Sequence, residues 1–224
     1  MIGFASLVVA AVVMELTVVF YVVGLYRKRS DLERFGDHGV KASFALFTLA
    51  SIYLLYLLLT KDFNNLYVST HTNRNLPTVY VVSAFWAGQE GSLLLWGWLT
   101  SLTALIVARK QISVDKFKPY VATILIIVQL FFVLTMIFAS NPFERQRSTP
   151  ADGQGLNPLL QDPGMVLHPP TLFVGYALIA VPFAYAMAGL MTKDEEWLSK
   201  IRTWTLLSWL FLSLGIALGG WWSY

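Results

Sequence analysis

The stretch PYVATILIIVQLFFVLTMIFA, residues 119–139, contains no charged side chain. About 20 consecutive apolar residues are enough for a helix to cross the hydrocarbon core of a bilayer. Five other apolar runs lie on either side of it, at about 3–25, 41–60, 92–108, 171–191 and 203–220. The sequence therefore predicts an all-α, polytopic integral membrane protein with about six transmembrane helices.

The composition limits the chemistry that this chain can perform. Hydrophobic residues make up 56% of the sequence, charged residues 13%, and there is no cysteine. Disulfides, thiolate metal sites and thiol catalysis are therefore excluded from the chain. The first apolar run has no basic segment before it and no small-residue cleavage site after it, so we expect it to remain in the protein. Residues 1–224 are predicted to form a single transmembrane domain.

Lysine and arginine are divided unequally between the two sides of the predicted membrane domain. Twelve of the 16 basic residues follow the first, third and fifth spans: Arg27, Lys28, Arg29, Arg34, Lys41, Arg109, Lys110, Lys116, Lys118, Lys193, Lys200 and Arg202. Cytoplasmic segments carry such an excess. Both termini and the segments 61–91 and 140–170 are therefore predicted to be periplasmic. The net charge of +3 then matches anionic membrane lipid and indicates no nucleic-acid partner.

A lone histidine marks the most distinctive segment, LNPLLQDPGMVLHPPTLFVGY, residues 156–176. Proline suits the first turn of a helix and disrupts later turns, so the fifth span is expected to begin at Pro169 and Pro170. His168 would then project from the mouth of that helix, after an ordered loop at 140–167. A helix N-terminus disfavours the imidazolium, so a neutral ring could ligate a metal or haem iron. A capping role satisfied by the loop backbone is an equal alternative.

A second marked segment, FWAGQEGSLLLWGWLTSL, spans residues 85–102. Trp86 is expected at the membrane interface, where tryptophan is common. Glu90 lies between Gly88 and Gly91, and glycines allow close backbone approach. Glu90 is predicted either to cap a helix beginning near Ser92 or to contact a ligand.

Three further ionisable residues need an explanation. Glu15 lies in the middle of the first span, where a carboxyl group is costly, and is expected to hydrogen-bond to a neighbouring helix or to belong to a site. His38 is expected to be solvated in a charged cytoplasmic loop. His71 is predicted on the same side as His168, so the two could in principle ligate one metal or haem from opposite faces.

Three motifs carry a resemblance to a known family. YVSTHTNRNLP, WAGQEGSLLLW and LNPLLQDPGMVLHPPTLFVGYA occur in the order and spacing of the N-terminal part of CcmF, the haem lyase subunit of cytochrome c maturation. The resemblance is specific from about Asp62 to Tyr224 and generic over the first two spans. One departure is Gln89, where many family members carry histidine.

The resemblance implies a function at the periplasmic face of a bacterial inner membrane. Haem would be attached there to the CXXCH cysteines of apocytochrome c, after transient delivery as b-type haem by the chaperone CcmE. His168 matches the family histidine that serves as an axial ligand of the haem iron. Glu90, Trp86, Trp221 and Trp222 are expected to contribute to the same haem site, and His71 is a weaker candidate ligand.

The family pattern continues beyond GGWWSY into a tryptophan-rich WWD domain and further spans, whose histidines hold an integral b-type haem. The resemblance therefore implies a partner chain, a C-terminal CcmF-like half that supplies the WWD domain, the second axial ligand and the b-haem ligands. A separately encoded subunit is favoured over a fragment. CcmH/CcmI-type subunits would present the apocytochrome.

The expected activity is that of a non-autonomous lyase subunit that positions haem, because no residue resembles a nucleophile. Two alternatives remain open. The chain could belong to a transporter of haem or another amphipathic ligand, with Glu15 and the third span lining the path, or it could be a structural scaffold of the maturation complex.

Overall fold

Six long helices account for most of the protein, as the apolar runs predict. The structure is a computed structural model that describes residues 2–110 and 116–223. Six of the described helices are long and apolar enough to span a membrane: α1 (Ile2–Arg27), α2 (Ser30–Leu59), α5 (Gln89–Lys110), α6 (Lys118–Phe138), α7 (Pro163–Thr192) and α8 (Trp197–Trp222). The all-α, multi-pass membrane fold is confirmed.

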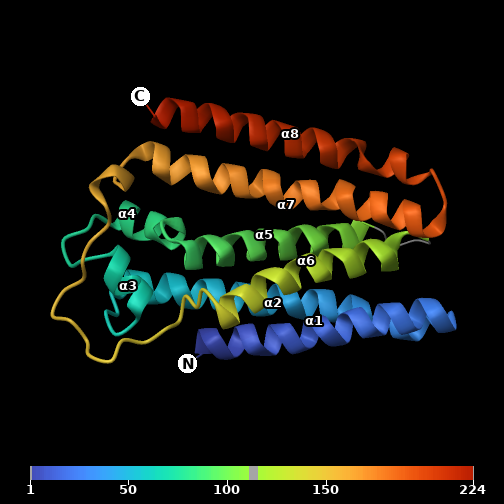
Figure 1. Ribbon diagram of the computed structural model, residues 1–224, viewed down its shortest axis with the longest axis horizontal. Helices are drawn as coiled ribbons and strands as arrows, with labels where there is room; N and C mark the ends of the chain where they lie inside the picture. The colour runs from blue at the N-terminus through green and yellow to red at the C-terminus, as the bar shows by residue number, and fades with distance from the viewer. Residues whose placement is uncertain (1, 111–115, 224) are drawn as a thin grey trace.

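The helices lie side by side in a bundle, with α1 at one edge and α8 at the opposite edge (Figure 1). α1 packs against α2 and α6, α5 packs against α2, α6 and α7, and α8 packs chiefly against α7. Both termini lie at the same end of the bundle, together with α3 (Leu66–His71), α4 (Thr78–Ser83) and the short 3-10 helix η1 (Ala84–Trp86) (Figure 1). We call this end the terminal end and the opposite end the hairpin end.

Helix α2 begins much earlier than predicted, and the expectation that His38 lies in a loop is wrong. The helix starts at Ser30 and includes the charged segment around His38, whose side chain is exposed. Asp31 in the first turn of α2 suits the positive end of the helix dipole. Asp37, one residue before His38, accepts a hydrogen bond of 2.8 Å from the Tyr21 hydroxyl of α1. These contacts hold the charged turns in helical form beyond the apolar span.

Aromatic packing fills the centre of the bundle. Trp96 of α5 lies against three rings of α6 and α7, with centroids 4.9, 5.9 and 5.2 Å away: Phe132, Phe173 and Tyr176. Trp98, one half-turn further along α5, donates its indole N–H to Thr48 of α2 at 3.0 Å. Trp96 packs against rings of α6 and α7, and Trp98 hydrogen-bonds to α2. The two tryptophans therefore join α5 to both halves of the bundle.

The long segment before α7 is ordered, in agreement with the prediction. Residues 139–162 lie across the segment that follows α2 and form backbone hydrogen bonds with it. The Leu66 N–H donates to the Glu144 carbonyl at 2.9 Å, and the Gln154 N–H donates to the Ser69 carbonyl at 2.7 Å. Because buried backbone groups need partners, these bonds let an irregular segment cover the terminal end of the bundle.

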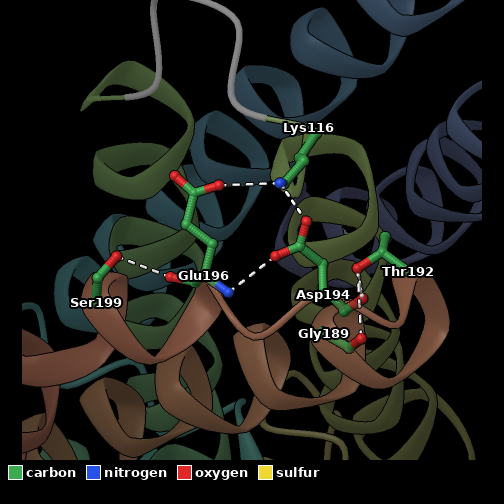
Figure 2. Close-up of polar contacts among 7 residues, drawn as sticks. Lys116, Gly189, Thr192, Asp194, Glu196 and Ser199 are labelled. Atoms are coloured by element: carbon green, nitrogen blue, oxygen red, sulfur yellow. Dashed lines mark hydrogen bonds and ion pairs between the residues drawn. The ribbon is translucent and has the colours of Figure 1, made fainter.

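Charged side chains tie the hairpin end together (Figure 2). Lys116, just before α6, forms ion pairs with Asp194 and with Glu196, the latter at 2.9 Å. The hydrogen bond to Asp194 raises the pKa of the Lys116 ammonium, and the same contact lowers the pKa of the Asp194 carboxyl. The Glu196 N–H also donates to the Asp194 carboxylate at 2.9 Å. The turn between α7 and α8 is therefore joined to the start of α6.

Candidate haem-handling site at the terminal end

Helix α7 begins six residues earlier than predicted, so the expectation that His168 projects from its mouth is wrong. Asp162 caps the helix, its carboxylate accepting a hydrogen bond of 2.6 Å from the Gly164 N–H. Pro163 occupies the first helical position, where proline costs nothing. The helix then continues through Pro169 and Pro170. His168 consequently lies in the wall of α7, in its second turn.

A distant tryptophan explains how the helix tolerates Pro169. Pro169 has no N–H, so the carbonyl of Met165, four residues earlier, has no helical donor. The indole N–H of Trp86 donates to that carbonyl at 3.0 Å. Trp86 therefore satisfies the backbone defect that Pro169 creates and ties η1 to the start of α7. This contact gives Trp86 a specific structural role in addition to the interfacial position predicted for it.

The His168 ring is oriented by a backbone carbonyl of α8. Its Nδ1 lies 2.7 Å from the Gly215 carbonyl oxygen. A carbonyl only accepts, so Nδ1 carries the proton and, in the neutral ring, Nε2 keeps the lone pair. Metal-ligating histidines commonly donate their second ring N–H to a carbonyl in this way, which fixes the tautomer and the ring orientation. The arrangement leaves His168 half-buried, with Nε2 as the atom able to ligate a metal ion.

Two glycines of α8 make room for this contact. A Cβ atom at Gly219 would lie 2.6 Å from the Cε1 atom of His168, and one at Gly215 would lie 2.5 Å from the Leu172 side chain. Gly215 and Gly219 form the small-xxx-small pattern that lets membrane helices approach closely. The α7–α8 contact therefore depends on glycine where His168 crosses α8.

Trp222 lies beside His168, and we call these two residues together with Gly215 and Gly219 the His168 cluster, to which Trp221 does not belong. The Trp222 ring centroid is 5.9 Å from that of His168, with the planes tilted by 42°. Its side chain also lies against Gly164, whose Cβ would be 2.5 Å from the Trp222 Cβ. Trp221 is 57% exposed. Of the predicted site residues, the structure thus brings together His168 and Trp222, and Trp86 joins them through Met165.

His71 belongs to a separate cluster built on Tyr67. The two rings stack with centroids 4.3 Å apart, and the His71 Nδ1 lies 2.9 Å from the Tyr67 carbonyl. The His71 Nε2 lies against Gly88, where a Cβ would be only 2.6 Å away. His71 and His168 contact different residues, so the idea that they ligate one metal from opposite faces gains no support from their contacts. Among residues 2–110 and 116–223, no cluster of three or more potential metal-ligating His, Cys, Asp or Glu side chains occurs.

Tyr67 also explains the glycines on either side of Glu90. Its hydroxyl donates to the Ala84 carbonyl at 2.8 Å and accepts the Gly88 N–H at 3.0 Å. A Cβ at Gly91 would lie 1.8 Å from the Phe85 carbonyl oxygen and 2.5 Å from the Tyr67 hydroxyl. Burial raises the pKa of the Tyr67 phenol well above its usual range, so the hydroxyl stays protonated and keeps its donor.

The prediction that Glu90 caps a helix beginning near Ser92 is wrong. Helix α5 begins at Gln89, and Glu90 lies half-buried in its first turn, where a carboxylate suits the helix dipole. Gln89 donates its side-chain amide to the Ser140 hydroxyl at 3.1 Å. Gln89 therefore links the start of α5 to the segment that follows α6.

Two features of the site escaped the sequence analysis. The spacing of Gly215 and Gly219 was visible, but nothing indicated that His168 would cross α8 at that point. The bond from Trp86 to the Met165 carbonyl joins residues 79 positions apart and leaves no local signal. The hydrogen bond expected between Glu15 and a neighbouring helix is not found among residues 2–110 and 116–223, because the side chain is exposed on the surface of α1. The alternative, that Glu15 belongs to a site, stays a prediction.

Comparison with known proteins gives the family. The family described as cytochrome C assembly protein matches residues 86–224, which include α5 to α8 and the His168 cluster. The chain belongs to this family. CcmF of Haemophilus influenzae, described as a cytochrome c-type biogenesis protein, is 43% identical over 81% of the chain and 28% of its own length. The related protein ccl1 of Rhodobacter capsulatus is 33% identical over 99% of the chain and 34% of its own length.

A solved structure agrees with this assignment. A structure titled cytochrome c heme lyase CcmF matches the whole chain with a TM-score of 0.86 and 28% sequence identity, and the match covers 36% of that protein. The chain thus spans about a third of the length of the relatives that it matches. The first two helices, generic in sequence, are included in the structural match.

Proposed function

We propose that this chain is the N-terminal part of a cytochrome c haem lyase and works at the terminal end of the bundle. The proposal rests on family membership and on one observation, the hydrogen bond from the His168 Nδ1 to the Gly215 carbonyl. That bond leaves the Nε2 lone pair as the free ligating atom. A neutral, oriented imidazole is what haem iron requires of an axial ligand.

The role of the chain would be to hold and orient haem as a substrate. Trp222 beside His168 offers an aromatic face to a planar ring, and Trp221 is exposed next to it. In thioether formation, each cysteine thiol of an apocytochrome c CXXCH motif adds across a haem vinyl group, the sulfur bonding to one carbon and the hydrogen to the other. The reaction needs fixed geometry more than a nucleophile from the enzyme, so positioning is the contribution we assign to this chain.

The proposal includes a partner for α8. The outer face of α8 carries large apolar side chains that are 49–68% exposed: Leu206, Trp209, Leu210, Leu214 and Ile216. In CcmF relatives, about two thirds of the protein lies outside the matched region. We infer that a C-terminal CcmF-like half packs on this face, adjoins the His168 cluster, and supplies the second axial ligand and the b-haem ligands.

The same proposal gives the cellular setting. The terminal end would face the periplasm from a bacterial inner membrane, because twelve of the 16 basic residues flank the other ends of the helices. Haem would arrive as transient b-type haem on a CcmE-type chaperone, and CcmH/CcmI-type subunits would present the apocytochrome.

Substitution of His168 tests the proposal. A strain carrying His168→Ala together with the C-terminal half should lose cytochrome c production and the substrate haem bound at His168, while the lyase complex still assembles and keeps the b-type haem of the C-terminal half. His38→Ala is the matched control, because His38 is exposed near the start of α2, at the hairpin end of the bundle. Normal cytochrome c production in the His168 variant would favour a scaffold. Loss of haem export with intact attachment of supplied haem would favour a transporter.

A further inference from the structure

Helix α1 carries an ionisable side chain on its outer surface at the middle of the membrane. Glu15 is exposed, and it is near the centre of the 26-residue helix Ile2–Arg27. At 1.5 Å per residue, its Cα is about 20 Å from either end of α1. A carboxyl group at this depth is costly in contact with lipid, and such groups are almost always paired or enclosed. No hydrogen bond or ion pair of the Glu15 side chain is found within the described part of this chain.

The residues around Glu15 form a regular stripe. Val8, Val12, Glu15, Val19 and Val22 follow one another at intervals of four, three, four and three residues, and the four valines are 39–53% exposed. This is the a/d spacing by which a second helix packs along a first with a shallow left-handed crossing. Valine has essentially one rotamer in a helix, so packing on this stripe loses little side-chain entropy.

We propose that this stripe is a docking surface for one transmembrane helix of a partner protein that carries a lysine or arginine at mid-depth. A single polar residue at an a or d position selects partner and register, and a basic side chain opposite Glu15 would pair with its carboxylate. A second copy of this chain fits poorly, because it would bring two Glu15 side chains together. The occupant is therefore a different helix with the opposite charge.

This surface is distinct from the one assigned to the C-terminal half. α1 and α8 lie at opposite edges of the bundle (Figure 1). The family match begins at residue 86, after α1 and α2. The proposal thus concerns assembly and does not rest on haem binding by His168.

The test uses designed single-span helices with lysine, leucine or glutamate at the centre, reconstituted in vesicles with the full chain. Because the chain has no cysteine, one introduced cysteine gives a unique site for a fluorescent label. Energy transfer should show that the lysine helix binds the unmodified chain about three- to tenfold more tightly than the leucine helix. Glu15→Leu should abolish that preference, and Glu15→Lys should transfer it to the glutamate helix.

A matched control moves the carboxyl by one residue. Glu15→Leu with Leu16→Glu keeps the composition but turns the charge away from the stripe by about 100°. This double variant should behave like Glu15→Leu. Equal binding of the three designed helices to the unmodified chain would overturn the proposal, and so would retention of the preference in the double variant. Glu15-dependent self-association that displaces the lysine helix would also overturn it.

A photo-crosslinker tests the native occupant. Placed at Val12 on the stripe, it should capture a transmembrane segment with a central lysine or arginine, and Glu15→Leu should abolish the capture. The same crosslinker at Val9, which is 49% exposed but off the stripe, is the control. Capture of a segment with no basic residue, or equal capture from both positions, would contradict the proposal.

Discussion

Gly219→Ala should disturb His168 without altering any chemical group of the site. The added Cβ would lie 2.6, 2.8 and 3.2 Å from three atoms of the His168 ring, its Cε1, Nδ1 and Nε2. The ring is held by its bond to the Gly215 carbonyl at 2.7 Å, so it cannot yield without lengthening that bond. Gly220→Ala is the matched control, since a Cβ there meets nothing within 4 Å in the described chain.

The difference in stability between Gly219→Ala and Gly220→Ala measures the cost of crowding the His168 ring. Replacing glycine by alanine inside a helix stabilises it by about 1 kcal/mol, and both variants share this gain. Inserting a methyl group into a packed contact costs about 1–3 kcal/mol, and only Gly219→Ala has this cost. The Gly219 variant should therefore be less stable than the Gly220 variant by about 1–3 kcal/mol.

Two measurements check the expectation. Unfolding in mixed micelles gives the stability difference between Gly219→Ala and Gly220→Ala. Nitrogen-15 NMR of histidine-labelled protein reports the tautomers, and the chain has only three histidines to assign. The His168 signals should indicate a protonated Nδ1 in the unmodified chain and in Gly220→Ala, and should change in Gly219→Ala. Equal stabilities together with unchanged His168 signals would refute the reasoning.

Two further predictions concern the contacts that frame the bundle. Trp86→Phe should destabilise the protein by about 1–3 kcal/mol, because the Met165 carbonyl, which Pro169 cannot serve, loses the indole donor. Adding Pro169→Ala should recover most of this loss in a double-mutant cycle, since alanine restores an N–H to that carbonyl; no recovery would argue against the mechanism. Protection of the α7–α8 turn from hydrogen exchange should fall as acidification passes the lowered pKa of Asp194, because its pairing with Lys116 contributes only while the carboxyl is ionised. In Asp194→Asn, the protection of this turn should be low at every pH. If that variant kept the pH profile of the unmodified chain, this ion pair would be excluded as the cause.

The fold was largely predictable from the sequence because membrane insertion depends on properties of continuous segments. Apolar length located six spans, and only their ends were wrong. Those errors have a common cause: helix ends are set by contacts made outside the apolar run. The bond from Tyr21 to Asp37 supports the extended start of α2, and the Asp162 cap begins α7 before its prolines.

The site was predictable in its residue types more than in its geometry. His168 stood out because a ligating residue beside two prolines is unusual, yet its orientation depends on Gly215 and Gly219, which come from another helix. Trp86 was explained as an interfacial side chain, because its partner is a backbone carbonyl that only the folded chain brings near. The exposure of Glu15 could not be predicted, because periodicity alone does not tell which face of α1 other helices cover.

The central claim is that the His168 Nε2 is the atom this chain offers to haem iron. The most direct test is the absorption spectrum of haem purified with the chain and its C-terminal half, compared between His168→Gly and His71→Gly. The account predicts that His168→Gly lowers the haem signal to that of the integral b-type haem held by the C-terminal half and that added imidazole restores the lost part, whereas His71→Gly keeps the full signal, since the His71 Nε2 faces Gly88. An unchanged haem spectrum in His168→Gly would contradict the account.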